Sequence, residues 1–215
     1  PTELPLPWLW ILAGPNGSGK TTIAADPRVI ALMAGSPSLN ADDVAKRLAD
    51  LDGTPVTQDI SLRAARIIDR EVDRLVKEGL GFTVETVLSS AKYKSIVKQA
   101  RKAGFQIGLI FVFTSQPDLN VLRVSQRVRA GGHHVPKDKV HARWFRSIEN
   151  LGWFAGRADQ LLVIDNSRTP EFLVQRQPDE ECWQLKPIST KAVANSLYRA
   201  QMARIRTAGR QSTDL

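Results

Sequence analysis

The stretch LWILAGPNGSGKTT, residues 9–22, contains the spacing G-x-x-x-x-G-K-[ST] between Gly14 and Thr21. An apolar run at residues 8–13 precedes it, and a helix is expected to begin near Gly19. In this pattern the glycines let backbone N–H groups point at a phosphate, the lysine reaches the β and γ oxygens, and the hydroxyl completes a Mg²⁺ shell. The strand–loop–helix context therefore predicts a site for ATP or GTP with Mg²⁺.

Different side chains of this loop are expected to bind different parts of the nucleotide. Lys20 is expected to bridge the β- and γ-phosphates, and Thr21 to be the Mg²⁺ ligand. The following helix presents its positive end to the same anion. Asp26-Pro27 interrupts that helix, which is therefore predicted to be short or kinked. The predicted nucleotide-binding residues are Gly14, Asn16, Gly17, Ser18, Gly19, Lys20, Thr21 and Thr22.

Composition is that of an ordinary globular protein with one domain. The chain has 215 residues, of which 42% are hydrophobic and 24% charged. No stretch approaches the roughly 18 consecutive apolar residues of a membrane span. The first residues show neither a basic segment nor a small-residue cleavage site, so no signal peptide is predicted. The single Cys182 excludes an intramolecular disulfide and a cysteine-based zinc site, and a cytoplasmic protein is expected.

The net charge of +8 and the pI near 9.9 call for an anionic partner. Nucleic acid and a small phosphorylated ligand both satisfy this requirement. The positive charges are spread along the chain, without a Lys/Arg block of five or more. A small phosphorylated ligand is therefore favoured over nucleic acid.

Short apolar runs alternate with helical periodicity, which is typical of a parallel α/β sandwich. The run FQIGLIFVF is apolar on both faces, as expected of a central parallel strand. The fold class predicted is α/β, a sandwich with a five-stranded, mainly parallel sheet. The five strands are expected at 8–13, 37–40, 81–84, 105–113 and 160–165.

The chain after Asn166 differs in character from the alternating part before it. Residues 172–177 and 181–186 are consistent with a hairpin, and a basic helix is expected at about 189–208. We therefore divide the chain into a P-loop domain at 1–168 and an appendage at 169–215 that belongs to the same structural unit.

A kinase needs a general base near the γ-phosphate to take the proton of an acceptor hydroxyl. Asp42 follows the short second strand, which places it at the carboxyl edge of the sheet, where ligands of such folds bind. Asp43 is the competing choice. Residues of the type N-A-D-D also make good helix caps, so a capping role for Asp42 is equally consistent with the spacing.

Glu85 ends the third predicted strand and thus reaches the same edge. Next to Thr86 and Ser89 it is suited to bind acceptor hydroxyls, although a single Glu after a strand is commonly solvated. A motor NTPase would instead show an apolar strand ending in Asp near the loop. Asp165 ends such a strand only very late in the chain, where a loop near the nucleotide base is the better interpretation.

Arginines cluster around the segment GGHHVPKD. Arg123 and Arg127 are four residues apart and share a helix face, with Arg129 just before the segment and Arg143 beyond it. Two arginine-bearing helices joined at Gly-Gly predict a lid, at about 123–143, that closes cations over phosphates. The histidines lack a patterned carboxylate, so no metal site is predicted for His133, His134 and His141.

Several motifs in this order resemble the zeta-toxin family of P-loop kinases, specifically its compact bacterial branch. The resemblance covers about residues 8–168, and the appendage is not part of it. The combination of E-T-V-L-S with R-V-x-x-R-V-x-x-G-G-H-x-V-P is the specific part. The motifs are AGPNGSGKTT, NADDVA, FTVETVLSS, GFQIGLIFVFTS, RVSQRVRAGGHHVPKDKVHAR and LLVIDNS.

The resemblance implies a P-loop kinase fold, which is a three-layer sandwich with an adenylate-kinase-like sheet and a helical lid. It also implies an ATP- and Mg²⁺-dependent phosphorylation of a hydroxyl. In studied members of the family the acceptor is UDP-N-acetylglucosamine, phosphorylated on its sugar, and the product starves cell-wall synthesis. By position, the family's base falls on Asp42 and its acceptor-binding carboxylate on Glu85, with Asn40 at the end of the short strand. Arg127 and Arg143 match the lid arginines, with Arg123 as a near alternative.

We therefore expect a bacterial phosphotransferase that moves the γ-phosphoryl group of ATP to a small hydroxyl-bearing acceptor. A UDP-sugar is the first choice, and an antitoxin protein is an expected partner. A nucleic-acid 5′-hydroxyl or an antibiotic is the alternative acceptor. An ATP-dependent nucleic-acid-binding switch, which would use the basic C-terminal helix, is the alternative of another class.

Overall fold

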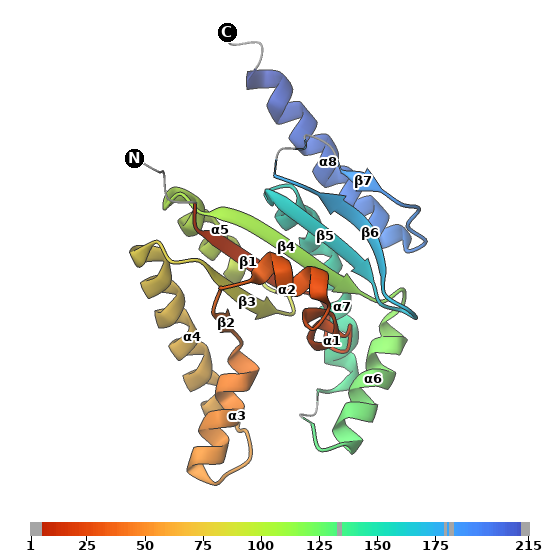
Figure 1. The fold of residues 1–215 in the computed structure, drawn as a ribbon. Coiled ribbons are helices and arrows are strands. Elements are labelled where there is room, and N and C mark those ends of the chain that lie inside the picture. Colours follow the sequence, from red (N-terminus) through yellow and green to blue (C-terminus); the bar gives the residue numbers. More distant parts are fainter. Residues whose placement is uncertain (1–5, 133–134, 179, 181–182, 212–215) are drawn as a thin grey trace.

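The computed structural model describes residues 6–132, 135–178, 180 and 183–211, and it has one seven-stranded sheet at its centre (Figure 1). The strand order is β2-β3-β1-β4-β5-β6-β7, and the first five strands in this order are parallel. The strands are β1 (Trp8–Ala13), β2 (Ser38–Leu39), β3 (Phe82–Thr86), β4 (Gln106–Phe113), β5 (Gln160–Asp165), β6 (Glu171–Arg176) and β7 (Gln184–Leu185).

The predicted α/β class is confirmed, with two strands more than expected. The additional strands are the hairpin after residue 169, because β6 pairs antiparallel with β5 and so extends the sheet. β7 is shorter than the segment 181–186 assigned to it; residues 181–182 lie outside the described part of the chain.

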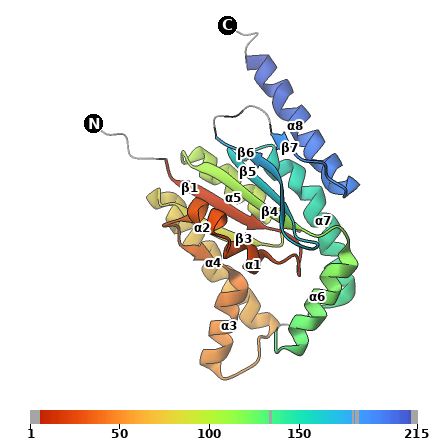
Figure 2. The same ribbon diagram turned by 45° about the vertical axis from the view of Figure 1, so that its right-hand side comes forward.

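The helices cover the two faces of the sheet unequally (Figures 1 and 2). α4, α5, α7 and α8 pack on one face and enclose the larger core, whereas α1 and α2 are the only helices of the described residues that pack on the other. α3 packs on α4 and α6 on α7, and these two pairs extend beyond the sheet on either side of the cavity described below. The helices are α1 (Lys20–Ala24), α2 (Pro27–Met33), α3 (Ala41–Asp52), α4 (Gln58–Glu78), α5 (Lys92–Lys102), α6 (Pro117–Arg129), α7 (Lys137–Ala155) and α8 (Lys191–Gln211).

The helix after the glycine-rich loop is short, as Asp26-Pro27 predicts. α1 has five residues and α2 restarts at Pro27, in the first helical position where the missing N–H of proline costs nothing. The Asp26 side chain accepts a hydrogen bond from the backbone N–H of Arg28 (2.9 Å) and caps the second helix.

α8 is held closely against α7 by one serine and one glycine. Ser196 Oγ donates to the Ile148 carbonyl (2.8 Å) and accepts from the Gly152 N–H (2.9 Å). A Cβ atom at Gly152 would lie 2.7 Å from the Ser196 carbonyl oxygen, so a larger residue would force the two helices apart.

The part of the chain that the structure describes contains no helix long and apolar enough to cross a lipid bilayer.

On the thinner face of the sheet, a buried tryptophan packs over a glycine of the neighbouring strand. The Trp10 indole lies on Gly108 of the neighbouring strand β4 and stacks on Trp8, with ring centroids 5.1 Å apart. A Cβ atom at Gly108 would lie 2.2 Å from Trp10 Cε3, and Trp10 is only 3% exposed.

We therefore expect Gly108→Ala to lower the free energy of unfolding by about 1–3 kcal/mol, the usual cost of overpacking a dense core. Trp10→Leu removes the ring that the new methyl group would meet, so in this background Gly108→Ala should lower the free energy of unfolding by less. Urea denaturation of the wild type, the two single variants and the double variant measures both values. Equal costs in the two backgrounds would show that Trp10 is not the reason for the glycine.

Candidate active site

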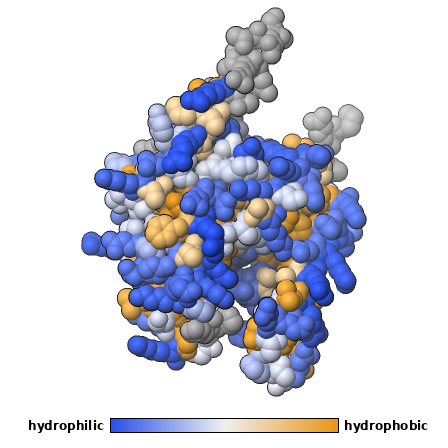
Figure 3. All heavy atoms as spheres, turned by 180° about the vertical axis from the view of Figure 1, so that it is seen from behind, coloured by the Kyte–Doolittle hydropathy of each residue, from blue (hydrophilic) through white to orange (hydrophobic). Residues whose placement is uncertain are grey.

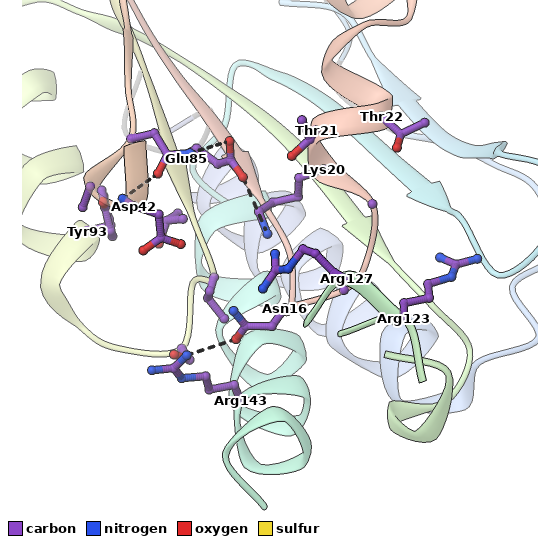
Figure 4. Close-up of a pocket in the computed structure, with 17 residues that line it drawn as sticks. Asn16, Lys20, Thr21, Thr22, Asp42, Glu85, Tyr93, Arg123, Arg127 and Arg143 are labelled. Atoms are coloured by element: carbon purple, nitrogen blue, oxygen red, sulfur yellow. Dashed lines mark hydrogen bonds and ion pairs between the residues drawn. The ribbon is translucent and has the colours of Figure 1, made fainter. Parts of the chain in front are cut away.

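The carboxyl edge of the parallel strands carries a cavity of about 470 Å³. The loop after β1, the start of α3 after β2 and the segment after β3 form its walls, and α6 and α7 contribute arginines (Figure 4). In the space-filling view from behind, a notch separates the lobe of α3 and α4 from that of α6 and α7 (Figure 3). The predicted site residues that line the cavity are Asn16, Gly17, Gly19, Lys20, Thr21, Thr22, Asn40, Asp42, Glu85, Thr86, Ser89, Arg123, Arg127 and Arg143.

The loop after β1 is packed so tightly that three of its positions, Gly14, Gly17 and Gly19, combine a positive φ with no room for a Cβ atom. Gly14 has φ +149°, and a Cβ atom there would lie 2.0 Å from the Val112 carbonyl oxygen. Gly19 has φ +89°, and its Cβ would lie 2.1 Å from Nδ2 of Asn166, which donates to the Ser18 carbonyl (2.8 Å). Gly14 and Ser18 are buried on the side of the loop that faces away from the cavity, and they do not line it.

Lys20 lies at the centre of the cavity. Its Nζ donates to the Gly14 carbonyl (3.0 Å) and is 3.9 Å from Glu85 Oε1, a distance at which the ion pair is loose. Burial lowers the pKa of Lys20, against the opposing effect of Glu85 and Asp42. A polyanion in the cavity would favour the charged lysine.

Asn40 connects the start of α3 with the end of β3 through both ends of its amide. Its Oδ1 accepts from the Asp42 N–H (2.9 Å), and its Nδ2 donates to Glu85 Oε2 (3.0 Å). Asn40 is thus the N-cap of α3, and the capping alternative for Asp42 is wrong. Asp42 lies in the first turn of α3, exposed at the cavity wall, and its chemical role stays a prediction.

Glu85 is a partly buried carboxylate at the end of β3. Burial raises its pKa, and the neighbouring Lys20 offsets this only in part. In the following turn Thr86 Oγ1 accepts from the Leu88 N–H (3.0 Å). Leu88 has φ +60°, a left-handed conformation uncommon for this residue type, and the turn directs Ser89 to the cavity.

Tyr93 is a cavity residue that sequence reasoning missed. It lies near the start of α5, 9% exposed, and burial raises the pKa of its phenol. Helical periodicity marks it only as an apolar core position. Its place just after the polar segment ETVLSS was the one available signal, because a tyrosine can pack in a core and still present a hydroxyl.

Of the predicted lid arginines, Arg143 bonds to a residue that lines the cavity, and Arg123 bonds to one outside the lining. Arg143 Nη1 donates to Asn16 Oδ1 (3.1 Å), and Arg123 Nη2 donates to the Ser167 carbonyl (3.2 Å). Figure 4 shows the Arg127 side chain directed toward Lys20, whereas Arg123 extends away from it. Arg129 does not line the cavity.

Of the three histidines, His133 and His134 lie outside the described residues. Nε2 of the third, His141, is 3.0 Å from Asp118 Oδ1. Among the residues that the structure describes, no group of three or more His, Cys, Asp or Glu side chains could hold a metal ion.

Comparison with known proteins gives one family and several structural relatives. The model of the family described as Zeta toxin matches residues 1–177. An uncharacterized protein of Haemophilus influenzae (strain ATCC 51907 / DSM 11121 / KW20 / Rd) is 27% identical over 146 residues, which cover 63% of this chain and 96% of the relative.

Two solved structures share the fold at low identity. A chain of the AvrRxo1-ORF1:-ORF2 crystal structure with ATP superposes with a TM-score of 0.70 at 15% identity, over 91% of this chain and 64% of that chain. A chain from the PezAT chromosomal toxin–antitoxin system of Streptococcus pneumoniae superposes with a TM-score of 0.61 at 14% identity, over 94% and 88%. This chain thus spans less than two thirds of the AvrRxo1-ORF1:-ORF2 chain it matches.

The raised pKa of Glu85 predicts how the free energy of unfolding depends on pH. Because the folded protein binds this proton more tightly than the unfolded chain, the contribution to stability is present below the ordinary pKa of 4.5 and is lost as the pH rises through the folded value. Glu85→Gln cannot ionise. We expect it to match the wild type in free energy of unfolding near about pH 4 and to exceed it near about pH 7.

Urea denaturation at both pH values checks this, with Glu149→Gln, which removes an exposed carboxylate on α7, as the control. A variant no more stable than the wild type near neutral pH would mean that Lys20 and Asn40 outweigh the burial of Glu85.

Proposed function

The chain belongs to the zeta toxin family, and on this basis we propose that it is a kinase that transfers the γ-phosphoryl group of ATP to a hydroxyl of a small acceptor. One observation carries the proposal. A phosphate-binding loop and a wall of carboxylate, amide and hydroxyl groups face one cavity, with three arginines at its border.

The donor half is the loop after β1 with α1. In the proposal its glycines let backbone N–H groups point at the phosphates, and Lys20, which lines the cavity, supplies the cation. Mg²⁺ fits the residues present, because the Thr21 hydroxyl, exposed at the cavity, and the carboxylates nearby are the oxygen ligands it prefers. When bound, Mg²⁺ would neutralise charge on the β- and γ-phosphates.

In the proposed reaction Asp42 takes the proton of the acceptor hydroxyl. The acceptor oxygen forms a bond to the γ-phosphorus, the bond from that phosphorus to the β–γ bridging oxygen breaks, and ADP leaves. Lys20, Arg127 and Arg143 stabilise the charge on the transferring group. The Arg127 orientation toward Lys20 and the bond from Arg143 to the loop support these assignments, with Arg123 assigned to binding.

The acceptor half supports a polyhydroxylated substrate. Its wall offers hydrogen-bond acceptors and donors without a cation of its own: Asn40, Asp42, Glu85, Thr86, Ser89 and Tyr93. Such groups pair well with the hydroxyls of a sugar ring. We therefore take a nucleotide sugar such as UDP-N-acetylglucosamine as the first candidate acceptor. The PezAT relative comes from a toxin–antitoxin system, and by that likeness an antitoxin protein belongs among the proposed partners.

Asp42→Asn tests the base. We expect it to keep ATP affinity within about twofold and to lose phosphoryl transfer by about 10²–10⁴-fold, the usual contribution of a positioned general base. Initial rates and titration of a fluorescent ATP analogue measure the two quantities. Asp43→Asn, at the neighbouring exposed position, is the matched control. Unchanged turnover in Asp42→Asn, or a larger loss in Asp43→Asn, would contradict the assignment.

Incubation with ATP and a panel of nucleotide sugars tests the acceptor. We expect mass spectrometry to detect a gain of one phosphoryl group on UDP-N-acetylglucosamine, which Lys20→Ala abolishes. Aminoglycosides and 5′-hydroxyl oligonucleotides belong in the same panel. A product only on one of these would reassign the acceptor, and steady ATP hydrolysis without any product would contradict the kinase.

A further inference from the structure

Two helices carry a disproportionate share of the positive charge. α5 contains five Lys or Arg residues and no Asp or Glu, and so does α8. The positive charges of the two helices together exceed the net charge of +8 of the whole chain. The rest of the chain therefore has a slightly negative net charge. Positive charge that is scattered along the sequence is therefore concentrated on two elements of the fold.

The fold brings these two helices together at the C-terminal end of α7. From α5, Arg101 Nη2 donates to the Arg157 carbonyl (2.6 Å), and its Nη1 pairs with Asp159 (2.8 Å). From α8, Arg204 Nη1 donates to the carbonyls of Gly156 (3.1 Å) and Ala158 (3.2 Å). α5 and α8 thus lie on either side of one short loop, in the same helical layer (Figures 1 and 2).

The C-terminal part of α7 carries an aromatic residue, Trp153, with two cations over its ring. The Arg157 guanidinium lies over the Trp153 ring, 4.2 Å from its centroid, and Lys94 Nζ is 5.6 Å from the same ring. The acids in this region include Asp159, which is paired with Arg101, Glu180, which lies near Arg176, and Glu149, which is exposed on α7. Cations from α5 and from the end of α7 therefore flank Trp153, and Arg204 of α8 binds to the same loop after α7.

Helical spacing places the other cations on the outer side of this layer. On α5, Lys94, Lys98 and Lys102 follow one another at intervals of four, and on α8 Arg199 and Arg206 are seven apart. Figure 3 shows this side of the molecule covered mainly by hydrophilic residues. We define the basic face as Lys94, Lys98, Arg101, Lys102, Arg157, Arg199, Arg204 and Arg206.

We propose that the basic face binds the phosphodiester backbone of single-stranded nucleic acid. α8 alone, with 21 residues, is about 31 Å long at 1.5 Å per residue, a length suited to a polymer rather than a metabolite. Tyr198, 63% exposed beside Arg199, and the half-buried Trp153 add rings on which unpaired bases can stack. Cations interleaved with aromatic rings are the composition of such surfaces.

The basic face is separate from the kinase cavity. Asp159 Oδ2 accepts a hydrogen bond from the Ile107 N–H (2.7 Å). This bond places the loop that follows α7 at the amino end of β4. The cavity lies at the carboxyl edge of the same sheet. The proposed binding therefore goes beyond the kinase reaction and does not require it.

A membrane surface fits the basic face less well. Amphipathic helices that lie on membranes carry a row of large apolar side chains beside the cations. Among the described side chains, α5 exposes no large hydrophobic residue, and α8 exposes only Tyr198 and Ile205.

The test uses fluorescein-labelled single-stranded RNA and DNA and a duplex of the same sequence, with fluorescence polarisation over a range of NaCl concentrations. The basic-face variant is Lys98→Gln/Lys102→Gln/Arg199→Gln/Arg206→Gln. The control variant, on α3 and α4, is Lys46→Gln/Arg47→Gln/Arg66→Gln/Arg70→Gln. Both remove four exposed positive charges, so general electrostatic attraction falls equally.

We expect the basic-face variant to bind single strands about tenfold more weakly, with the slope of log K against log salt reduced by about 3, whereas the control stays within about twofold. Circular dichroism and ATP-analogue binding of the basic-face variant should match the wild type. Absence of salt-dependent binding by the wild type, or equal weakening in both variants, would overturn the proposal. So would tighter binding of poly-glutamate, phosphatidylserine vesicles or the duplex than of the single strands.

Discussion

The loop between β1 and α1 rests against the Val112 carbonyl of β4 and the side chain of Asn166, which directly follows β5, and the cavity is built around the loop in this position. Any side chain at Gly14 or Gly19 would push the loop outward. With the loop in place, Asn16 reaches the arginine of α7, and Lys20 reaches both the loop carbonyls and Glu85. The cavity is therefore organised by close packing behind it.

Lys20 and Glu85 link the two halves of the cavity without forming a strong pair. Burial lowers the pKa of Lys20 and raises that of Glu85, so each is pushed toward its neutral form although the other lies 3.9 Å away. Desolvation thus outweighs their attraction, as is common for buried charges. Bound ligands can stabilise the charged forms of both groups. A triphosphate offsets the desolvation of the charged lysine, and an acceptor hydroxyl can donate a hydrogen bond to the carboxylate.

The parallel core, the short α1 and the membership of a kinase-like family follow from local pattern: an apolar run, a glycine loop, a proline break and ordered motifs. Most of the predicted site residues do line one cavity, because parallel strands end at the same edge. Tyr93 was missed, because a tyrosine in a helical pattern resembles any core residue. The capping alternative for Asp42 was settled only by the hydrogen bonds of Asn40.

The sequence by itself determined the phosphate loop, the class of the sheet and the residue types at each strand end, since these depend on neighbours within a few positions. Only the tertiary structure decided that β6 and β7 extend the sheet, that Asn40 joins Asp42 to Glu85, and that α5 and α8 form one basic face. The physical reason is that each of these contacts joins segments far apart in the chain. Their pairing depends on packing and register across the whole sheet, which no local pattern records.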